Sequence, residues 1–132
     1  MSAQPDKDIH ILLEDQQKIN KFARQNQRLE DIKDELKAKE NEIVTIKDAT
    51  TDVEELELTC EEGEKIPYLV GEIFVMETPT DVQTLLEERK MELEQEVVGL
   101  EEKATAIRVV MSDLKTHLYA KFGDAINLEA DE

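Results

Sequence analysis

The sequence predicts a mainly α-helical protein in which two long helices pair antiparallel as a coiled coil, with a β-hairpin between them. Three observations support this prediction. Residues 80–122 hold an almost unbroken heptad pattern, residues 66–76 hold two short apolar runs around a glycine, and the 132 residues include only 4 glycines and 3 prolines. A chain so poor in glycine and proline suits long helices better than turn-rich folds.

The heptad pattern of residues 80–122 places apolar side chains at alternating spacings of four and three, which form one narrow stripe on a helix. Such a stripe is covered by one partner helix rather than by a globular core. A helix of this length reaches roughly 60 Å, so an elongated protein is expected. Its seam residues are Leu86, Leu93, Val97, Leu100, Ala104, Ile107, Met111 and Leu114.

A first helix is expected over residues 10–55, because the same spacing occurs there. It should begin between His10 and Asp15, although no capping box marks the boundary. The polar residues Gln25 and Lys39 interrupt its stripe and can set the register of the pair. Its seam residues are Leu29, Ile32, Leu36, Ile43 and Ile46, and Val53 continues the spacing.

Residues 56–79 are expected to form a loop followed by a hairpin that turns at Gly71 and Glu72. Neither run alternates with polar residues, so the hairpin is apolar on both faces, and two helices cannot cover both. A lone two-stranded hairpin is marginal in water, and its edges invite further strands. It therefore either pairs with strands of other chains or folds back onto its own helices. The residues concerned are Ile66, Tyr68, Leu69, Val70, Ile73, Phe74, Val75 and Met76.

The second helix has two possible starting signals. Thr80 with Gln83 makes a capping box, and Thr78 followed by Pro79 is the alternative. Its end is expected near Phe122, before Gly123 and an acidic tail over residues 123–132.

Antiparallel pairing would bring the two chain ends together at one tip. A thin coil cannot bury all the apolar residues there, so we expect an exposed apolar surface, which normally marks an interaction site. The tip residues are Ile11, Leu12, Leu13, Ile19, Phe22, Leu118, Tyr119, Phe122, Ile126 and Leu128.

The charge of the chain excludes two classes of partner. The net charge is −17, with 33 acidic and 16 basic residues. Nucleic acids and anionic membranes both require a basic surface, so neither is expected. No apolar run approaches the roughly 20 residues of a membrane span, and the first residues do not read as a secretory signal. The single cysteine, Cys60, fits a reducing compartment.

Enzymatic chemistry is not expected either. His10 and His117 have no Cys or His ligands near them in sequence, and Cys60 has no base that would activate it. The carboxylates have the spacing of a helix surface rather than of a pocket, and no glycine-rich phosphate loop is present. We therefore expect no catalytic residue, no metal and no cofactor.

Three blocks resemble β-class prefoldin subunits. They are residues 14–24, residues 66–68 with residues 71–74, and residues 118–123 with residues 126–131. The resemblance covers the chain after about residue 10. We expect the chain to form a single domain over residues 1–132.

This resemblance implies a hexamer with two α-class and three further β-class subunits as partners. Its hairpins form a β-barrel platform and its coiled coils hang from it. It implies a cytoplasmic co-chaperone that holds unfolded proteins such as actin and tubulin at apolar tips and passes them to the cytosolic chaperonin without ATP. The alternative from the residues is a structural coiled-coil scaffold or tether without holding activity.

Overall fold

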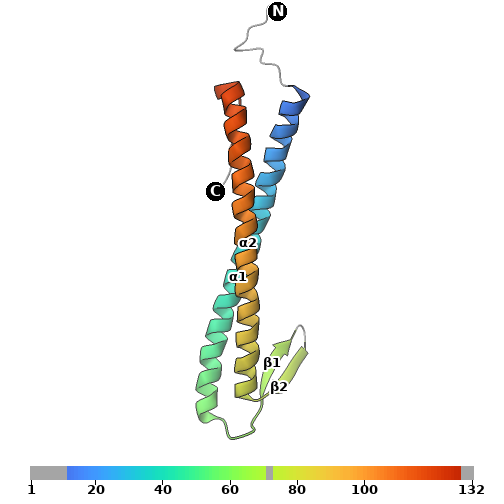
Figure 1. Ribbon diagram of the computed structural model, residues 1–132. Helices are drawn as coiled ribbons and strands as arrows, with labels where there is room; N and C mark the ends of the chain where they lie inside the picture. Colours follow the sequence, from blue (N-terminus) through green and yellow to red (C-terminus); the bar gives the residue numbers. More distant parts are fainter. Residues whose placement is uncertain (1–11, 71–72, 129–132) are drawn as a thin grey trace, which may run out of the picture. The chain divides into compact units, whose positions relative to one another are not determined.

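The structure is a computed structural model that describes residues 12–70 and 73–128. Helix α1 spans Leu13–Thr59, strands β1 and β2 span Ile66–Val70 and Ile73–Glu77, and helix α2 spans Pro79–Phe122 (Figure 1). A short 3-10 turn, Gly123–Ala125, follows α2. The prediction of a mainly α fold, with two long antiparallel helices and a hairpin between them, is confirmed.

The chain divides into two compact units. The terminal unit combines Met1–Glu35 with Leu100–Glu132, and the hairpin unit is Leu36–Gly99. Each unit holds a segment of α1 packed on a segment of α2. In the terminal unit Asp15 contacts Lys121 and Lys18 contacts His117, so α2 runs opposite to α1.

The terminal unit has its own apolar core. The seam side chains are buried because each helix offers one apolar stripe to the other. Leu29 and Leu118 have no exposed surface, and Ile32 and Leu114 pack against the core while staying partly exposed. The buried members of this core are Phe22, Leu29, Ala104, Ile107, Met111, Leu118, Phe122 and Leu128.

The hairpin unit has a second core, to which the hairpin itself contributes. Ile66 and Tyr68 of β1 pack against it, as do Ile43 and Ala49 of α1. Its buried members are Ile46, Val53, Val82, Leu86 and Leu93. Of the expected seam residues, Leu36 and Val97 are only half-buried, whereas Leu100 of the terminal unit is buried.

Ion pairs flank the seam of the hairpin unit. Lys39, the residue that interrupts the stripe, places its ammonium nitrogen 3.0 Å from a carboxylate oxygen of Glu96, and Arg89 Nε lies 2.9 Å from Glu42. These side chains are partly exposed, so each pair contributes at most about 1 kcal/mol. Their main consequence is register, because only one alignment of the helices brings both pairs together.

Helix α1 continues to Thr59, beyond the expected boundary at residue 55. Val53 is its last buried residue, whereas Leu58 is 88% exposed. The apolar stripe and the helix therefore end at different places, because residues 54–58 are Glu and Leu, which favour helix without any packing. The chain turns only at Gly63, whose φ of +80° suits glycine.

Helix α2 begins with the second of its two possible caps. Thr78 Oγ1 accepts a hydrogen bond from the Asp81 amide at 3.3 Å, and Pro79 is the first helical residue. The capping box of Thr80 with Gln83 is not formed, because both side chains instead donate to the Glu57 carboxylate of α1. This contact between the helices replaces the local one.

Gly99 is a position in α2 at which a substitution should stabilise the protein. It lies within α2, and a Cβ built there would meet nothing within 4 Å. Gly99→Ala should therefore raise the free energy of unfolding by about 0.5–1 kcal/mol, through helix propensity alone. Thermal unfolding followed by circular dichroism measures this effect.

The matched control is Ala106→Gly, at an exposed position of the same helix. It should lower the stability by a similar amount. An unchanged or lower unfolding midpoint for Gly99→Ala would contradict this prediction and show that the fold requires glycine at this position.

Candidate functional site

The expected apolar tip is only partly exposed. Leu12 and Leu13 are 50% and 74% exposed, in line with the expectation. Phe22, Leu118, Phe122 and Leu128 are instead buried, so they do not contribute to the exposed part of the tip. The half-buried side chains are Ile19, Tyr119 and Ile126, and Ile11 lies outside the described residues.

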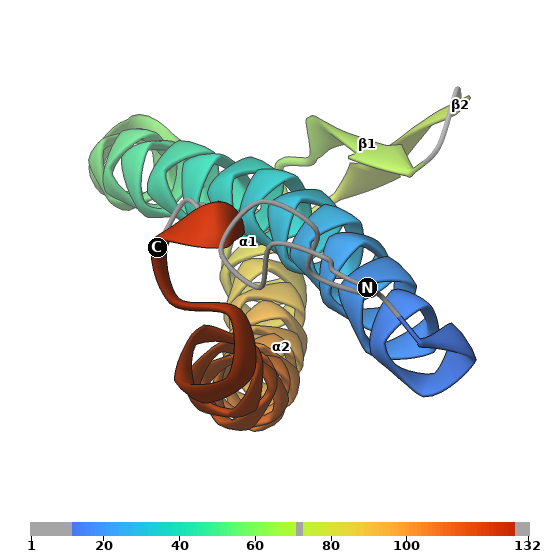
Figure 2. The ribbon, with the colours of Figure 1, turned by 90° about the horizontal axis from the view of Figure 1, so that it is seen from above.

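The tail explains why these four side chains are buried. Gly123 has a φ of +58° and ends α2, after which the 3-10 turn reverses the chain (Figures 1 and 2). Ile126 is extended, with φ −128° and ψ 144°, and Leu128 reaches the core of the terminal unit. A third segment of the chain therefore joins the two helices in the core that contains Phe122.

Tyr119 fastens the tail through its hydroxyl group. The hydroxyl accepts a hydrogen bond from the Leu128 amide at 2.9 Å and donates one to the Leu128 carbonyl at 3.4 Å. The ammonium nitrogen of Lys115 lies 5.9 Å from the centre of the Tyr119 ring, close enough for a cation–π interaction.

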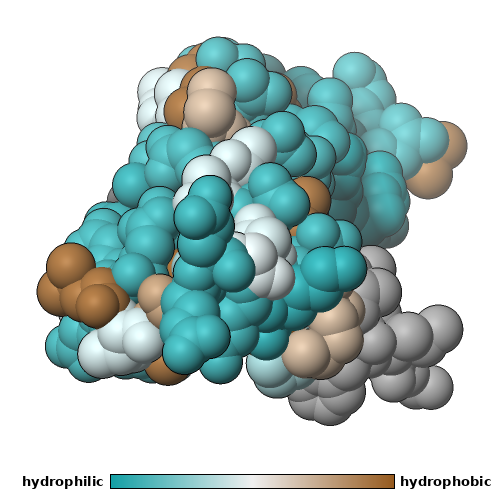
Figure 3. Space-filling model, turned by 90° about the horizontal axis from the view of Figure 1, so that it is seen from below, coloured by the Kyte–Doolittle hydropathy of each residue, from teal (hydrophilic) through white to brown (hydrophobic). Residues whose placement is uncertain are grey.

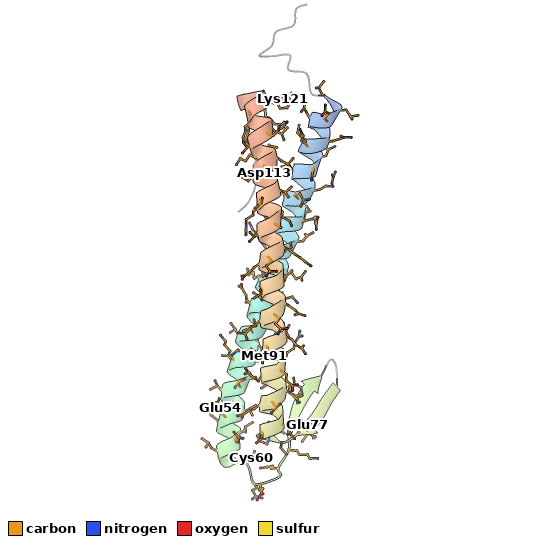
Figure 4. All side chains as sticks on the ribbon, in the orientation of Figure 1. Glu54, Cys60, Glu77, Met91, Asp113 and Lys121 are labelled. Carbon is orange, nitrogen blue, oxygen red and sulfur yellow. The ribbon has the colours of Figure 1, made fainter. Side chains whose placement is uncertain are left out.

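A buried carboxylate joins the helix ends of the terminal unit. Lys121 lies in the last turn of α2 (Figure 4). Asp15 is 2% exposed, and its Oδ2 lies 2.6 Å from the ammonium nitrogen of Lys121. The same oxygen accepts a hydrogen bond from the Leu12 amide at 3.3 Å, as the third residue of a helix often does. Hydrogen bonding by Lys121 is the main reason that the pKa of Asp15 lies below its ordinary value.

His117 contacts a lysine of the other helix. Its Nε2 lies 2.8 Å from the ammonium nitrogen of Lys18, a geometry in which the ammonium donates and the neutral imidazole accepts. Within residues 12–70 and 73–128, no three His, Cys, Asp or Glu side chains form a group that could hold a metal ion. The prediction for His10 lies outside the described residues.

The hairpin side chains whose burial is described differ between the core side and the opposite side. The strands pair antiparallel, with Tyr68 opposite Val75 and Pro67 opposite Met76. Ile66 and Tyr68 pack against the core of the hairpin unit, whereas Pro67 is exposed and Met76 is 54% exposed. The folding back onto the chain's own helices, one of the two expected alternatives, therefore accounts for one face only. The expected turn at Gly71 and Glu72 lies outside the described residues.

Some structural residues were missed by the heptad analysis. Val82 is buried although it is not among the expected seam residues. Asp15 was not singled out either. The available signal was an acidic residue in the first turn of a helix, a place where it can bond back to the residue before the helix.

The described surface offers no catalytic chemistry. Burial raises the pKa of the Cys60 thiol, and Glu64 raises it further, so the reactive thiolate is disfavoured. One hollow of the hairpin unit is lined by residues that include Thr50, Glu54, Thr84 and Glu87. The hydroxyl groups of Thr50 and Thr84 donate to backbone carbonyls of their own helices rather than to a carboxylate. No helix in the part of the chain that the structure describes is long and apolar enough to cross a bilayer.

Two long antiparallel helices with a short β-hairpin between them define the class as a helical-hairpin protein. The family model for a prefoldin subunit matches residues 16–125. A probable prefoldin subunit 4 of Drosophila melanogaster is 45% identical over 125 residues, which cover 95% of this chain and 88% of that protein. Prefoldin subunit 4 of Homo sapiens is 42% identical, with coverage of 95% and 91%, and that of Saccharomyces cerevisiae is 35% identical, with coverage of 90% and 89%.

The chain belongs to the prefoldin subunit family. Members of this family are non-enzymatic subunits of a chaperone complex built from coiled-coil helices. The expectation that the chain is not an enzyme is therefore confirmed.

Acidification tests the contact between Asp15 and Lys121. A carboxylate whose pKa is lowered by folding stabilises the fold fully above its unfolded pKa of about 3.9, and this contribution is lost as the pH falls through the folded pKa. Asp15→Asn should thus be less stable than the wild type at pH 7, and the difference should shrink below about pH 4. Urea midpoints measured between pH 7 and pH 3 test this.

Glu14→Gln, which removes a charge from the neighbouring exposed position, is the control and should show no comparable change. A difference between Asp15→Asn and wild type that stays constant with pH would contradict the assignment.

Proposed function

We propose that this chain is a β-class subunit of a hexameric cytoplasmic co-chaperone. With two α-class and three further β-class subunits, it holds unfolded proteins such as actin and tubulin and passes them to the cytosolic chaperonin without ATP. The observation that carries the proposal is the family match over residues 16–125. The geometry of the hairpin and of the chain ends supports it.

The hairpin is the proposed assembly surface. Its strands have only each other as sheet neighbours within the described residues, and unpaired strand edges readily accept another strand. The exposed Pro67 and Met76 leave apolar surface on the face that the helices do not cover. Strands of neighbouring subunits would pair with these edges and cover this apolar surface, as in the β-barrel platform that the family resemblance implies.

The chain ends are the proposed site for unfolded proteins. Leu12 and Leu13 offer exposed apolar surface beside the first turn of α1. Full burial of one such side chain contributes about 1.5–3 kcal/mol before ordering costs, so a single arm binds weakly. Several arms around one client act together through effective concentration, and weak single contacts permit release without ATP.

The acidic surface supports this function because repulsion between like charges keeps the apolar surfaces of different molecules apart. The net charge is −17, and the surface in Figure 3 is mostly hydrophilic, with its hydrophobic residues in separate patches. High charge of one sign opposes self-association. The subunit would thus stay dispersed until it meets its partners.

Met76→Glu tests the assembly surface. A charge on the exposed face should prevent entry into the complex, because an unpaired charge cannot be buried between subunits without large cost. Helicity should remain, since Met76 lies outside the helices. Co-expression with the other subunits, followed by native mass spectrometry, measures incorporation.

Val44→Glu is the matched control, because Val44 is equally exposed but lies on α1. It should assemble normally. Full incorporation of Met76→Glu would refute the assignment of this face.

Leu13→Ser tests the client surface. Leu13 is 74% exposed, so the substitution should leave the stability unchanged. It should weaken the holding of an unfolded protein by the assembled complex about two- to fivefold, as expected from losing part of one apolar contact. The measurement is the concentration of complex that half-suppresses aggregation of a chemically denatured protein.

Val109→Ser removes similar apolar surface from the exposed side of α2 and should have no effect. Equal effects of the two substitutions would remove Leu13 from the site. If the wild-type complex suppresses no aggregation at all, the scaffold alternative is favoured.

A further inference from the structure

The tail of the terminal unit lies in a site with features of a peptide-binding site. We propose that the seat of Leu128 binds extended apolar segments of unfolded polypeptides, and that the chain's own tail occupies this seat until such a segment displaces it. The inference rests on the proposed function and adds a mode of recognition to it. It also implies that the empty subunit shields part of its apolar surface.

The seat recognises an apolar side chain by burial. Leu128 is only 6% exposed, and it belongs to the same core as Phe22, Leu118 and Phe122. Ile126, two residues earlier, packs partly against that core. An occupant therefore needs apolar residues at alternate positions, which is the pattern of an extended chain with one buried face.

Tyr119 recognises the backbone of the occupant. Its hydroxyl bonds both the amide and the carbonyl of Leu128, at 2.9 Å and 3.4 Å. Every residue except proline carries these two groups, so the contact does not depend on the occupant's side chains. Ile126 has the φ and ψ of extended chain, the conformation in which an unfolded segment would present the same groups. A site of this kind tolerates many sequences.

The described part of the tail is short and has little secondary structure of its own. It follows the short 3-10 turn Gly123–Ala125 and forms no longer helix or strand among the described residues. Gly123, with its φ of +58°, marks the point where the chain reverses. A hollow lined by Tyr119, Gly123, Ile126 and Asn127 adjoins the tail. The tail thus competes with an unfolded segment mainly because it is tethered beside the seat.

Release of the tail tests the inference. Leu128→Asp removes the anchor, and Asn127→Asp adds the same charge at an exposed position beside it. The complex reconstituted with its partner subunits is titrated onto fluorescent, reduced and carboxymethylated lactalbumin, a permanently unfolded probe. Leu128→Asp should tighten binding about three- to tenfold because the tail no longer blocks the seat, and Asn127→Asp should bind like the wild type.

Two further measurements test the mode of recognition. An acetylated and amidated peptide of residues 123–128 should displace the probe from the Leu128→Asp complex. In that same background Tyr119→Phe should weaken probe binding about two- to fivefold, since it removes only the hydroxyl. Unchanged binding in both measurements would overturn the assignment of the seat.

The outcomes separate this inference from the proposed function. Equal binding by wild type and Leu128→Asp, or weaker binding by Leu128→Asp with intact helicity, overturns the tail as a competitor while holding activity stands. Absence of probe binding in all three complexes refutes the proposed function itself. If Leu128→Asp does not assemble, Leu128→Ala provides the same test with a smaller expected change in the same direction.

Discussion

The structure depends on one constraint, which is that a helix in a pair can bury only a single stripe of side chains. Leu29 and Leu93 have no exposed surface because each faces the partner helix along this stripe. Residues off the stripe, such as Val44 and Val109, stay more than half exposed although they are equally apolar. Apolar side chains off the stripe therefore stay exposed unless a segment outside the helix pair covers them.

Each compact unit meets this constraint with a third segment. In the hairpin unit β1 supplies Ile66 and Tyr68 to the core, and in the terminal unit the tail supplies Leu128. Both segments give the core only part of their apolar surface, since Pro67 of β1 and Ile126 of the tail remain at least partly exposed. The segments that complete the cores are thus also the segments proposed to bind other polypeptides, because neither is fully satisfied by its own chain.

Charge has two different roles. On the surface, ion pairs such as Lys39–Glu96 are worth little but select one register of the helices. At the chain ends Asp15 is buried, and a buried carboxylate without a partner would be costly. Lys121 and the Leu12 amide both donate hydrogen bonds to this carboxylate. The charged contact with Lys121 therefore holds the start of α1 beside the end of α2.

The sequence was sufficient to predict the two helices and the hairpin, because heptad spacing and β-favouring runs are local patterns. It was also sufficient to predict the family, because three blocks of residues resemble that family. It also contained Gly123, which marks the end of α2, but not the direction that the chain takes after it. Three results became clear from the folded structure alone: the burial of Phe22, Leu118 and Phe122, the capping of α2 by Thr78 rather than Thr80, and the pairing of Asp15 with Lys121. These outcomes depend on contacts between residues far apart in the chain, and a local sequence pattern does not specify such contacts.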